Sequence, residues 1–248
     1  MKLGGSVVTD KAAYRAPRLD VLSRLAQESA TTREPLIVVH GAGSYGHVLA
    51  KQFDLARGRD EDARRDAAFA QVHADVRELS VLVLEALRDA GLPALAHSTY
   101  DLARLHEGKL LSFAHVAVAD TLAAGFIPVL SGDGVLDASR GWGILSGDVI
   151  MAELARAFRP QRAVFVTDVD GIFDRWPEGR LLPRIGPHDH VGAAGAKNDV
   201  TGGMVGKLAR AREVAKAGVE VVVVNGLVPG RLADALAGKA TLGTIVTA

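Results

Sequence analysis

Short apolar runs alternate along the chain with longer stretches of helical periodicity, and this alternation constrains the fold more than any other feature. The apolar runs predict buried strands at 36–40, 163–167 and 219–224, with weaker candidates at 94–97 and 126–130. Apolar periodicity and turn signals predict helices at 66–90, 204–217 and 231–237. Continuous apolar strands joined by helices predict an α/β fold whose mostly parallel sheet is covered on both faces.

The length and composition fit a single α/β domain. A chain of 248 residues, 48% of them hydrophobic, can bury a large core without disulfides or a structural metal. We therefore expect one domain over residues 1–248, or two tightly joined lobes. The sequence has no cysteine, which excludes disulfides, thiolate catalysis and Cys-based metal sites.

The charge balance limits the partners. Lys+Arg and Asp+Glu each number 29, and zero net charge argues against a dedicated nucleic-acid binder, because phosphate contacts need a basic surplus. Zero net charge does not exclude a small basic pocket for one phosphorylated ligand. The N-terminal residues lack the apolar segment of a signal peptide, and no run approaches the roughly 20 apolar residues that span a bilayer. We expect a cytoplasmic protein with no membrane partner.

Glycine-rich turns follow several of the predicted strands, where open parallel sheets bind their ligands. Six turns combine glycine with Ser, Thr, Asp, His or Lys: 4–6, 41–47, 131–133, 146–148, 167–171 and 201–207. Glycine lets backbone N–H groups approach phosphate oxygens closely, and helix N-termini favour the same anions. Several such turns together predict a site for more than one phosphate.

Two common nucleotide motifs do not account for these turns. Residues 41–46 match G-x-G-x-x-G, but no strand with an acidic residue follows, because residues 57–67 are charged and predicted to be helical. Residues 202–208 differ from the Walker motif in spacing and end in Leu208. The dense charge run at 57–65 is interpreted as a solvated loop and helix start.

Three lysines beside the turns are candidates for binding phosphate. Lys2 precedes the first turn, Lys11 follows it, and Lys207 lies in the first turn of a predicted helix, where the dipole disfavours a cation. A lysine in that place suggests a nearby anion. Phosphoryl transfer supplies one, and it needs mainly positioning and charge neutralisation. The alternative for each lysine is a solvated surface position.

Four aspartates in or near the later turns are further candidates: Asp148, Asp168, Asp170 and Asp174. Asp favours turns without any catalytic role, and this alternative is strongest for Asp174. Asp168 stands at the exit of a predicted strand, where a carboxylate could orient a lysine, hold the nucleotide or bind Mg²⁺ indirectly.

His47 is the most informative single residue. It follows Gly46 at a predicted helix start, where the dipole disfavours imidazolium but a bound phosphate favours it. A histidine that binds an already phosphorylated acceptor fits both effects, and a capping or packed histidine is the alternative. His188 and His190 lie in a polar loop and are interpreted as solvated. The histidines show no metal-ligand spacing.

Together the motifs resemble the amino acid kinase superfamily and, within it, the isopentenyl phosphate kinase family. The matching segments run in order from residue 2 onwards: Lys2–Ser6 with Lys11, His40–His47, Ser146–Asp148, Thr167–Gly171 and Thr201–Lys207. The resemblance implies an open αβα sandwich with a central, mostly parallel sheet, usually as a homodimer. It also implies an acceptor-binding lobe over residues 1–150 and an ATP-binding lobe over residues 151–248.

The resemblance also implies roles for individual residues. The ATP phosphates would be lined by Lys2, Leu3, Gly4, Gly5 and Ser6, and the rest of the nucleotide side would include Gly43, Asp168, Gly203 and Lys207. Lys11 would stabilise the transition state, with Lys2 and His47 as further catalytic residues. Isopentenyl phosphate would be held by Ala42, His47 and Gly147. Mg²⁺ would be a cofactor beside ATP, with no residue assigned as its ligand.

Ala42 departs from the family pattern, which usually has glycine there. Its methyl group is harmless if φ stays negative, and it crowds the acceptor phosphate if the group points into the site. An apolar pocket is also expected for the isoprenoid tail. The apolar stripe of Val72, Val76, Leu79, Leu82 and Val83 could form one wall of it, although such stripes are more often simply core.

The implied reaction is ATP-dependent phosphorylation of isopentenyl phosphate to isopentenyl diphosphate, in isoprenoid biosynthesis by the mevalonate pathway. A fosfomycin-type phosphonate kinase, or another small-acid kinase of the same fold, is the near alternative. A nucleotide-binding storage or regulatory protein without turnover is the distant one. The joint presence of Lys2, Lys11 and Lys207 argues against this last alternative.

Overall fold

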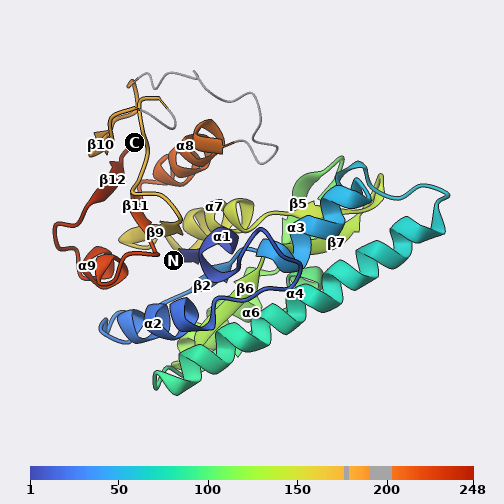
Figure 1. Ribbon diagram of the computed structural model, residues 1–248, viewed down its shortest axis with the longest axis horizontal. Helices are drawn as coiled ribbons and strands as arrows, with labels where there is room; N and C mark the ends of the chain where they lie inside the picture. The colour runs from blue at the N-terminus through green and yellow to red at the C-terminus, as the bar shows by residue number, and fades with distance from the viewer. Residues whose placement is uncertain (176–178, 190–202) are drawn as a thin grey trace.

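An eight-stranded sheet lies at the centre of the computed structural model, which describes residues 1–175, 179–189 and 203–248 (Figure 1). From edge to edge the strands are β10 (Arg184–Ile185), β12 (Gly243–Val246), β11 (Glu220–Asn225), β9 (Arg162–Thr167), β1 (Lys2–Leu3), β2 (Val38–His40), β6 (Ile127–Ser131) and β3 (Ala94–Ala96). In the described part of the chain, every pairing in this sheet is parallel except that of β11 with β12. The predicted fold class is therefore confirmed.

The predicted strands and helices are all present, with boundaries shifted by a few residues. The largest helix, α4 (Ala63–Asp89), begins earlier than predicted because Asp62 caps it and accepts a hydrogen bond from the backbone N–H of Arg64. The two other predicted helices are α8 (Gly203–Ala215) and α9 (Arg231–Leu236).

Helices cover both faces of the sheet, as an αβα sandwich requires. Along β9, Ala163 and Phe165 pack on one face, and Val164 and Val166 pack on the other. The first face is covered by α6 (His115–Ala123), α7 (Gly147–Phe158) and α8. The second is covered by α2 (Leu19–Ser29), α4 and α9, and Figure 1 shows α4 and α8 on opposite sides.

A second, four-stranded sheet extends the N-terminal half and does not follow from the sequence patterns. Its order is β5 (Lys109–Phe113), β4 (Ala103–His106), β7 (Asp133–Asp137) and β8 (Gly141–Leu145), and α5 (Thr99–Leu102) precedes it. Alternate residues of β4 are exposed and β8 contains two glycines, so neither forms a continuous apolar run. Its strand β7 begins at Asp133, directly after β6 of the large sheet ends at Ser131.

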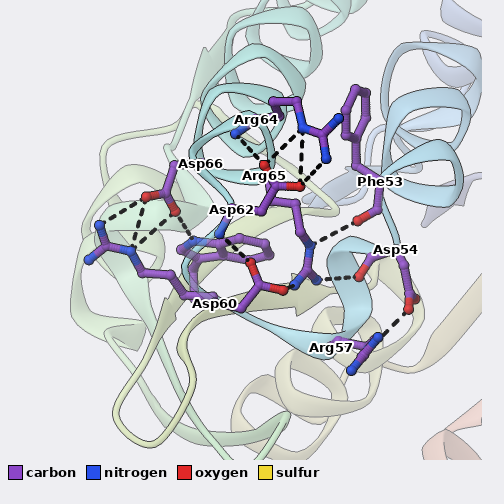
Figure 2. A network of polar contacts seen from close by, with 10 residues as sticks. Phe53, Asp54, Arg57, Asp60, Asp62, Arg64, Arg65 and Asp66 are labelled. Carbon is purple, nitrogen blue, oxygen red and sulfur yellow. Dashed lines mark hydrogen bonds and ion pairs between the residues drawn. The ribbon is translucent and has the colours of Figure 1, made fainter.

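The charge run at 57–65 corrects one expectation. Arg65 is buried, and its guanidinium donates to the carbonyl oxygens of Phe53 and Asp54 and pairs with Asp60 (Figure 2). It also lies 5.6 Å from the ring centroid of Trp142. The run is therefore only partly solvated. It ties the short helix η1 (Leu55–Arg57) to the start of α4 and to β8.

The apolar stripe of α4 belongs to the core, as its more common interpretation predicted. Leu79 and Val83 pack under the large sheet. Val72 and Val76 join Leu55, Ala68 and Trp142 in a separate group, called here the third cluster. Among the described residues, no helix combines the length and the hydropathy of a transmembrane segment.

Candidate active site

The candidate site lies at the carboxyl ends of the central strands. The chain order reverses at β1, which pairs with β2 on one side and with β9 on the other. Gly4 follows β1, and its N–H donates to the carbonyl of Val166 in β9 at 2.9 Å. The N–H of Gly41, after β2, donates to the carbonyl of Leu3 at 2.9 Å. Ligands of open α/β sheets bind at such a reversal point.

The first two glycine turns touch each other at this point. A Cβ atom built on Gly5 would lie 2.5 Å from the backbone N of Gly43, and one built on Gly41 would lie 2.7 Å from the backbone N of Gly5. Gly43 has a φ of +51° and begins α3 (Gly43–Gln52). These positions need glycine because two backbones approach each other, which sets the N–H groups of both turns side by side.

Thr9 joins these turns, although no sequence motif marks it. Its buried hydroxyl donates to the carbonyl of Gly5 at 2.7 Å and accepts the N–H of Ser44 at 2.9 Å. Only its closeness to Lys11 in the sequence could have pointed to it. Thr9 thus links α1 (Gly5–Val8) to α3 across the site.

The three predicted lysines come together around two aspartates. Lys2 Nζ lies 2.9 Å from Asp148 Oδ1, and Asp148 is in the first turn of α7. Lys11 Nζ and Lys207 Nζ lie 3.8 and 3.6 Å from the two carboxylate oxygens of Asp168. These last two distances exceed hydrogen-bond length, so both ammonium groups keep their donors for a ligand. The cations outnumber the carboxylates, which favours an anion.

Asp168 is ionised in this setting. Burial raises the pKa of its carboxyl group, but the charges of Lys207 and Lys11 and a hydrogen bond from Ser6 hold the pKa below its ordinary value. The position of Lys207 against its helix dipole predicted a nearby anion, and Asp168 is that anion. A carboxylate is the anion that offsets the unfavourable helix dipole when no ligand is bound.

His47 lies in α3, beside the same charges. His47 is exposed, but loss of hydration beside the surrounding protein groups, and then the charges of Lys11 and Lys2, lower the pKa of its ring, while Asp148 opposes them. No described residue hydrogen-bonds to the imidazole. The ring is thus neutral at pH 7, and neither of its nitrogens has a hydrogen-bond partner among the described residues. A bound dianion would raise the pKa of the ring.

Ala42 keeps a negative φ of −67° at the N-cap of α3, so its methyl group causes no backbone strain. That methyl group packs toward the third cluster and lies 2.5 Å from where a Cβ on Gly46 would stand. It therefore points into the protein interior. The crowding of an acceptor phosphate that the sequence left open does not follow from this geometry.

Gly147 also meets the site at close range. A Cβ built there would lie 3.1 Å from Lys2 Cε and 3.4 Å from the carbonyl oxygen of His40. It begins α7, whose N-cap Ser146 accepts a hydrogen bond from the N–H of Val149. The structure therefore brings Gly147 beside Lys2, at a helix N-terminus that favours anions.

The remaining predicted residues are placed less centrally. Leu3 is buried in β1, and Gly203 is the first residue of α8. Asp170 accepts hydrogen bonds from Asn225 and Arg231, and these lower its pKa, so it has a structural role.

Two further candidates have turn or surface roles. Asp174 accepts the N–H of Arg180 at 2.8 Å, as a turn residue does. His188 is exposed, whereas His190, Thr201 and Gly202 lie outside the described residues.

Comparison with known proteins shows the family to which this chain belongs. A sequence profile of the amino acid kinase family matches residues 1–225. An isopentenyl phosphate kinase of Methanothermobacter thermautotrophicus is 36% identical, with 100% of this chain and 98% of that protein covered. The isopentenyl phosphate kinase of Thermoplasma acidophilum is 33% identical over 99% of this chain and 98% of its own.

Solved structures give the same result. An X-ray structure of isopentenyl phosphate kinase superposes with a TM-score of 0.88 at 32% identity, covering 99% of this chain and 98% of that one. Acetylglutamate kinases are more distant, and one from Anaeromyxobacter dehalogenans is 27% identical over 100% of this chain and 98% of its own. The chain therefore belongs to the amino acid kinase family, in its isopentenyl phosphate kinase group.

Proposed function

We propose that this protein transfers the γ-phosphoryl group of ATP to isopentenyl phosphate and so makes isopentenyl diphosphate for isoprenoid biosynthesis. The observation that carries the proposal is the convergence of Lys2, Lys11 and Lys207 with His47 at one edge of the sheet. Two anionic substrates must meet for this reaction. A surplus of cations and exposed backbone N–H groups is what such a meeting requires.

ATP is proposed to lie on the side of Asp168 and Lys207. Asp168 directly follows β9 and Lys207 lies in α8, so both belong to the C-terminal half. The turn of Gly4–Ser6 and the start of α3 at Gly43 would offer N–H groups to the phosphates. Leu3 and Gly203 complete this side as strand end and helix start.

The acceptor is proposed to lie on the side of His47, Ala42 and Gly147. A phosphate monoester carries about two negative charges at pH 7, since its second pKa is near 6. His47 has a free ring nitrogen for one of its oxygens, and the N-terminus of α7 favours the same group. The half-buried side chains on the edge of the third cluster, such as Leu49 and Phe69, would receive the apolar tail.

The proposed step is an in-line displacement. An oxygen of the acceptor phosphate forms a bond to the γ-phosphorus, and the bond from that phosphorus to the β,γ-bridging oxygen breaks, so that ADP leaves with the electron pair. Lys11 would lie against the transferring group and Lys2 against the oxygens around it. Neither lysine needs to exchange a proton, because their task is to stabilise negative charge.

Mg²⁺ is proposed as the companion of ATP. Within the described residues, no group of three His, Cys, Asp or Glu side chains could hold a metal by itself. Mg²⁺ in kinases is commonly held by substrate phosphates and water with one or two carboxylates, and Asp168 is the carboxylate on the nucleotide side. The ion would neutralise phosphate charge when bound.

A panel assay tests this proposal. The purified protein is given ATP and Mg²⁺ with isopentenyl phosphate, fosfomycin or N-acetylglutamate, and ADP release is followed together with the phosphorus NMR spectrum of the product. We expect isopentenyl phosphate to be the best acceptor and a diphosphate to appear. Turnover of a phosphonate or carboxylate with isopentenyl phosphate untouched would limit the assignment to the amino acid kinase family.

Three further expectations complete the proposal: a homodimer, a cytoplasmic location and a place in the mevalonate pathway. Their support is the family membership alone. Sedimentation of the purified protein tests the first of them.

A further inference from the structure

Lys11 lies on a loop of residues 9–18, called here the Lys11 loop, which connects α1 to α2. Thr9 and Pro17 form an antiparallel bridge at its base, and the N–H of Asp10 donates to the carbonyl of Ala16 at 2.8 Å. The Lys11 side chain is 62% exposed. The base of the loop is thus closed, but its own backbone does not explain how the part carrying Lys11 is held over the site.

Two side chains of the loop bind α4 instead. The Tyr14 hydroxyl donates to the carboxylate of Asp75, and the Arg15 guanidinium donates to Glu78. Arg15 Nη1 also lies 3.7 Å from the other oxygen of Asp75. Gln71, one turn earlier on α4, donates to that oxygen at 2.8 Å.

Asp75 makes this attachment specific. Its side chain is only 2% exposed, and a carboxylate so buried is unfavourable unless its charge is paired and hydrogen-bonded. In the described part of the chain, two of its three polar partners, Tyr14 and Arg15, come from the Lys11 loop. Movement of the loop away from α4 would leave the buried carboxylate with Gln71 alone.

The loop is also joined to the turn that carries His47. The guanidinium of Arg15 lies 5.9 Å from the ring centroid of the buried Tyr45, and the N–H of Ala16 donates to the Ser44 hydroxyl at 3.1 Å. Arg15 has a φ of +53°, the left-handed region that non-glycine residues rarely occupy. Surrounding contacts hold it in that conformation.

We infer that Asp75, with Tyr14 and Arg15, positions Lys11 for phosphoryl transfer. Asp75 is a positioning residue, since it touches the loop and not the reacting groups. Loss of the attachment is expected to lower kcat, because Lys11 would spend less time beside the transferring group, while the binding of both substrates changes little. The inference rests on the proposed function through the role of Lys11.

Tyr14→Phe is the principal variant, since it removes one hydroxyl group and leaves the loop backbone unchanged, and Asp75→Asn is the second. We expect kcat to fall about tenfold in each, with both KM values within about twofold of wild type. In a Lys11→Ala background neither substitution should lower kcat further, because the residues then act through a side chain that is absent. Additive losses in that background would overturn the inference.

Asp66→Asn is the matched control. Asp66 is also on α4 and pairs with an arginine, Arg59, at 2.9 Å, but it does not contact the Lys11 loop. Hydrogen exchange of residues 10–16 in ligand-free protein gives a readout without turnover. It should rise in Tyr14→Phe and stay unchanged in Asp66→Asn, and unchanged exchange in both overturns the attachment. A wild type inactive on isopentenyl phosphate would refute the proposed function instead.

Discussion

Lys2 and Lys11 reach the same site by different routes. Lys2 projects from a strand at the centre of the sheet, its side chain is 14% exposed, and it pairs closely with Asp148 at 2.9 Å. Lys11 projects from a loop, its side chain is 62% exposed, and its nearest carboxylate oxygen is 3.8 Å away. A charge on the sheet is fixed by the fold itself. A charge on a loop depends on side-chain attachments elsewhere, and it remains available to a moving phosphoryl group.

The largest effect is expected from removing the loop-borne charge. Lys11→Ala should lower kcat by about 10²-fold or more, the scale of a lost preorganised stabilising group, with a much smaller change in acceptor KM. Steady-state kinetics with both substrates varied measures this. Wild-type kcat in the variant would remove Lys11 from the mechanism and leave the strand-borne lysine as the main contributor.

A second prediction concerns His47, which lies on a helix beside the two lysines. His47→Ala should raise the KM for isopentenyl phosphate by about tenfold or more, the cost of one charge-assisted hydrogen bond, while the KM for ATP changes little. His47→Gln retains a donor and should recover part of the loss. Equal increases in the KM values for isopentenyl phosphate and ATP would show that His47 does not bind the acceptor selectively.

A third prediction concerns Lys207, on the nucleotide side of the site. Lys207→Ala should raise the KM for ATP by about fivefold, a modest change because its side chain is 37% exposed and solvent screens the charge. Calorimetric titration with a non-hydrolysable ATP analogue provides the direct measurement. A loss confined to acceptor binding would show that the two sides are reversed.

The smallest expected effect lies outside the site, in the second sheet. Burial raises the pKa of Asp137, but hydrogen bonds from Gly108, Ser139 and Arg140 outweigh it and lower the pKa to about 2. A group with a lowered folded-state pKa stabilises the protein above its unfolded pKa of about 4, and this stabilisation is lost as the pH falls to about 2.

Asp137→Asn should therefore lower the free energy of unfolding at pH 7 by about 1 kcal/mol. The difference from wild type should shrink between pH 4 and pH 2. Urea unfolding at several pH values measures it, with Asp120→Asn as the control, since Asp120 is exposed on α6. A difference that stays constant between pH 4 and pH 2 would show that ionisation of Asp137 does not contribute to the pH dependence of the free energy of unfolding.

The residues predicted from sequence are those that follow strands of the large sheet. Gly41 and Asp168 could be placed together because the carboxyl ends of parallel strands meet at one edge, whereas Lys2 lies in the two-residue strand β1, which no apolar run marked, and was found through the glycine turn after it. Continuous apolar runs mark such strands, and glycine marks the turns after them. The fold and the centre of the site were therefore predictable from local patterns.

Residues that act through distant side chains were not predictable in this way. Asp75 lies 61 residues from Tyr14, and nothing in the polar face of a long helix distinguishes it from its neighbours. The expectation of a solvated charge run is wrong at Arg65 for the same reason, because a ring and two carbonyl groups from other segments bury it. The second sheet lacks the apolar runs on which strand prediction depends.

The contact between Ala42 and Gly46 has a consequence for how this turn can change. A Cβ on Gly46 would meet the methyl group of Ala42 at 2.5 Å, whereas its next neighbours, Val76 and Val72, lie at 3.6 and 3.9 Å. The two positions therefore share room for one methyl group. Gly46→Ala is therefore expected to destabilise the turn in this chain and to be tolerated better together with Ala42→Gly, so the effects of the two substitutions should not add.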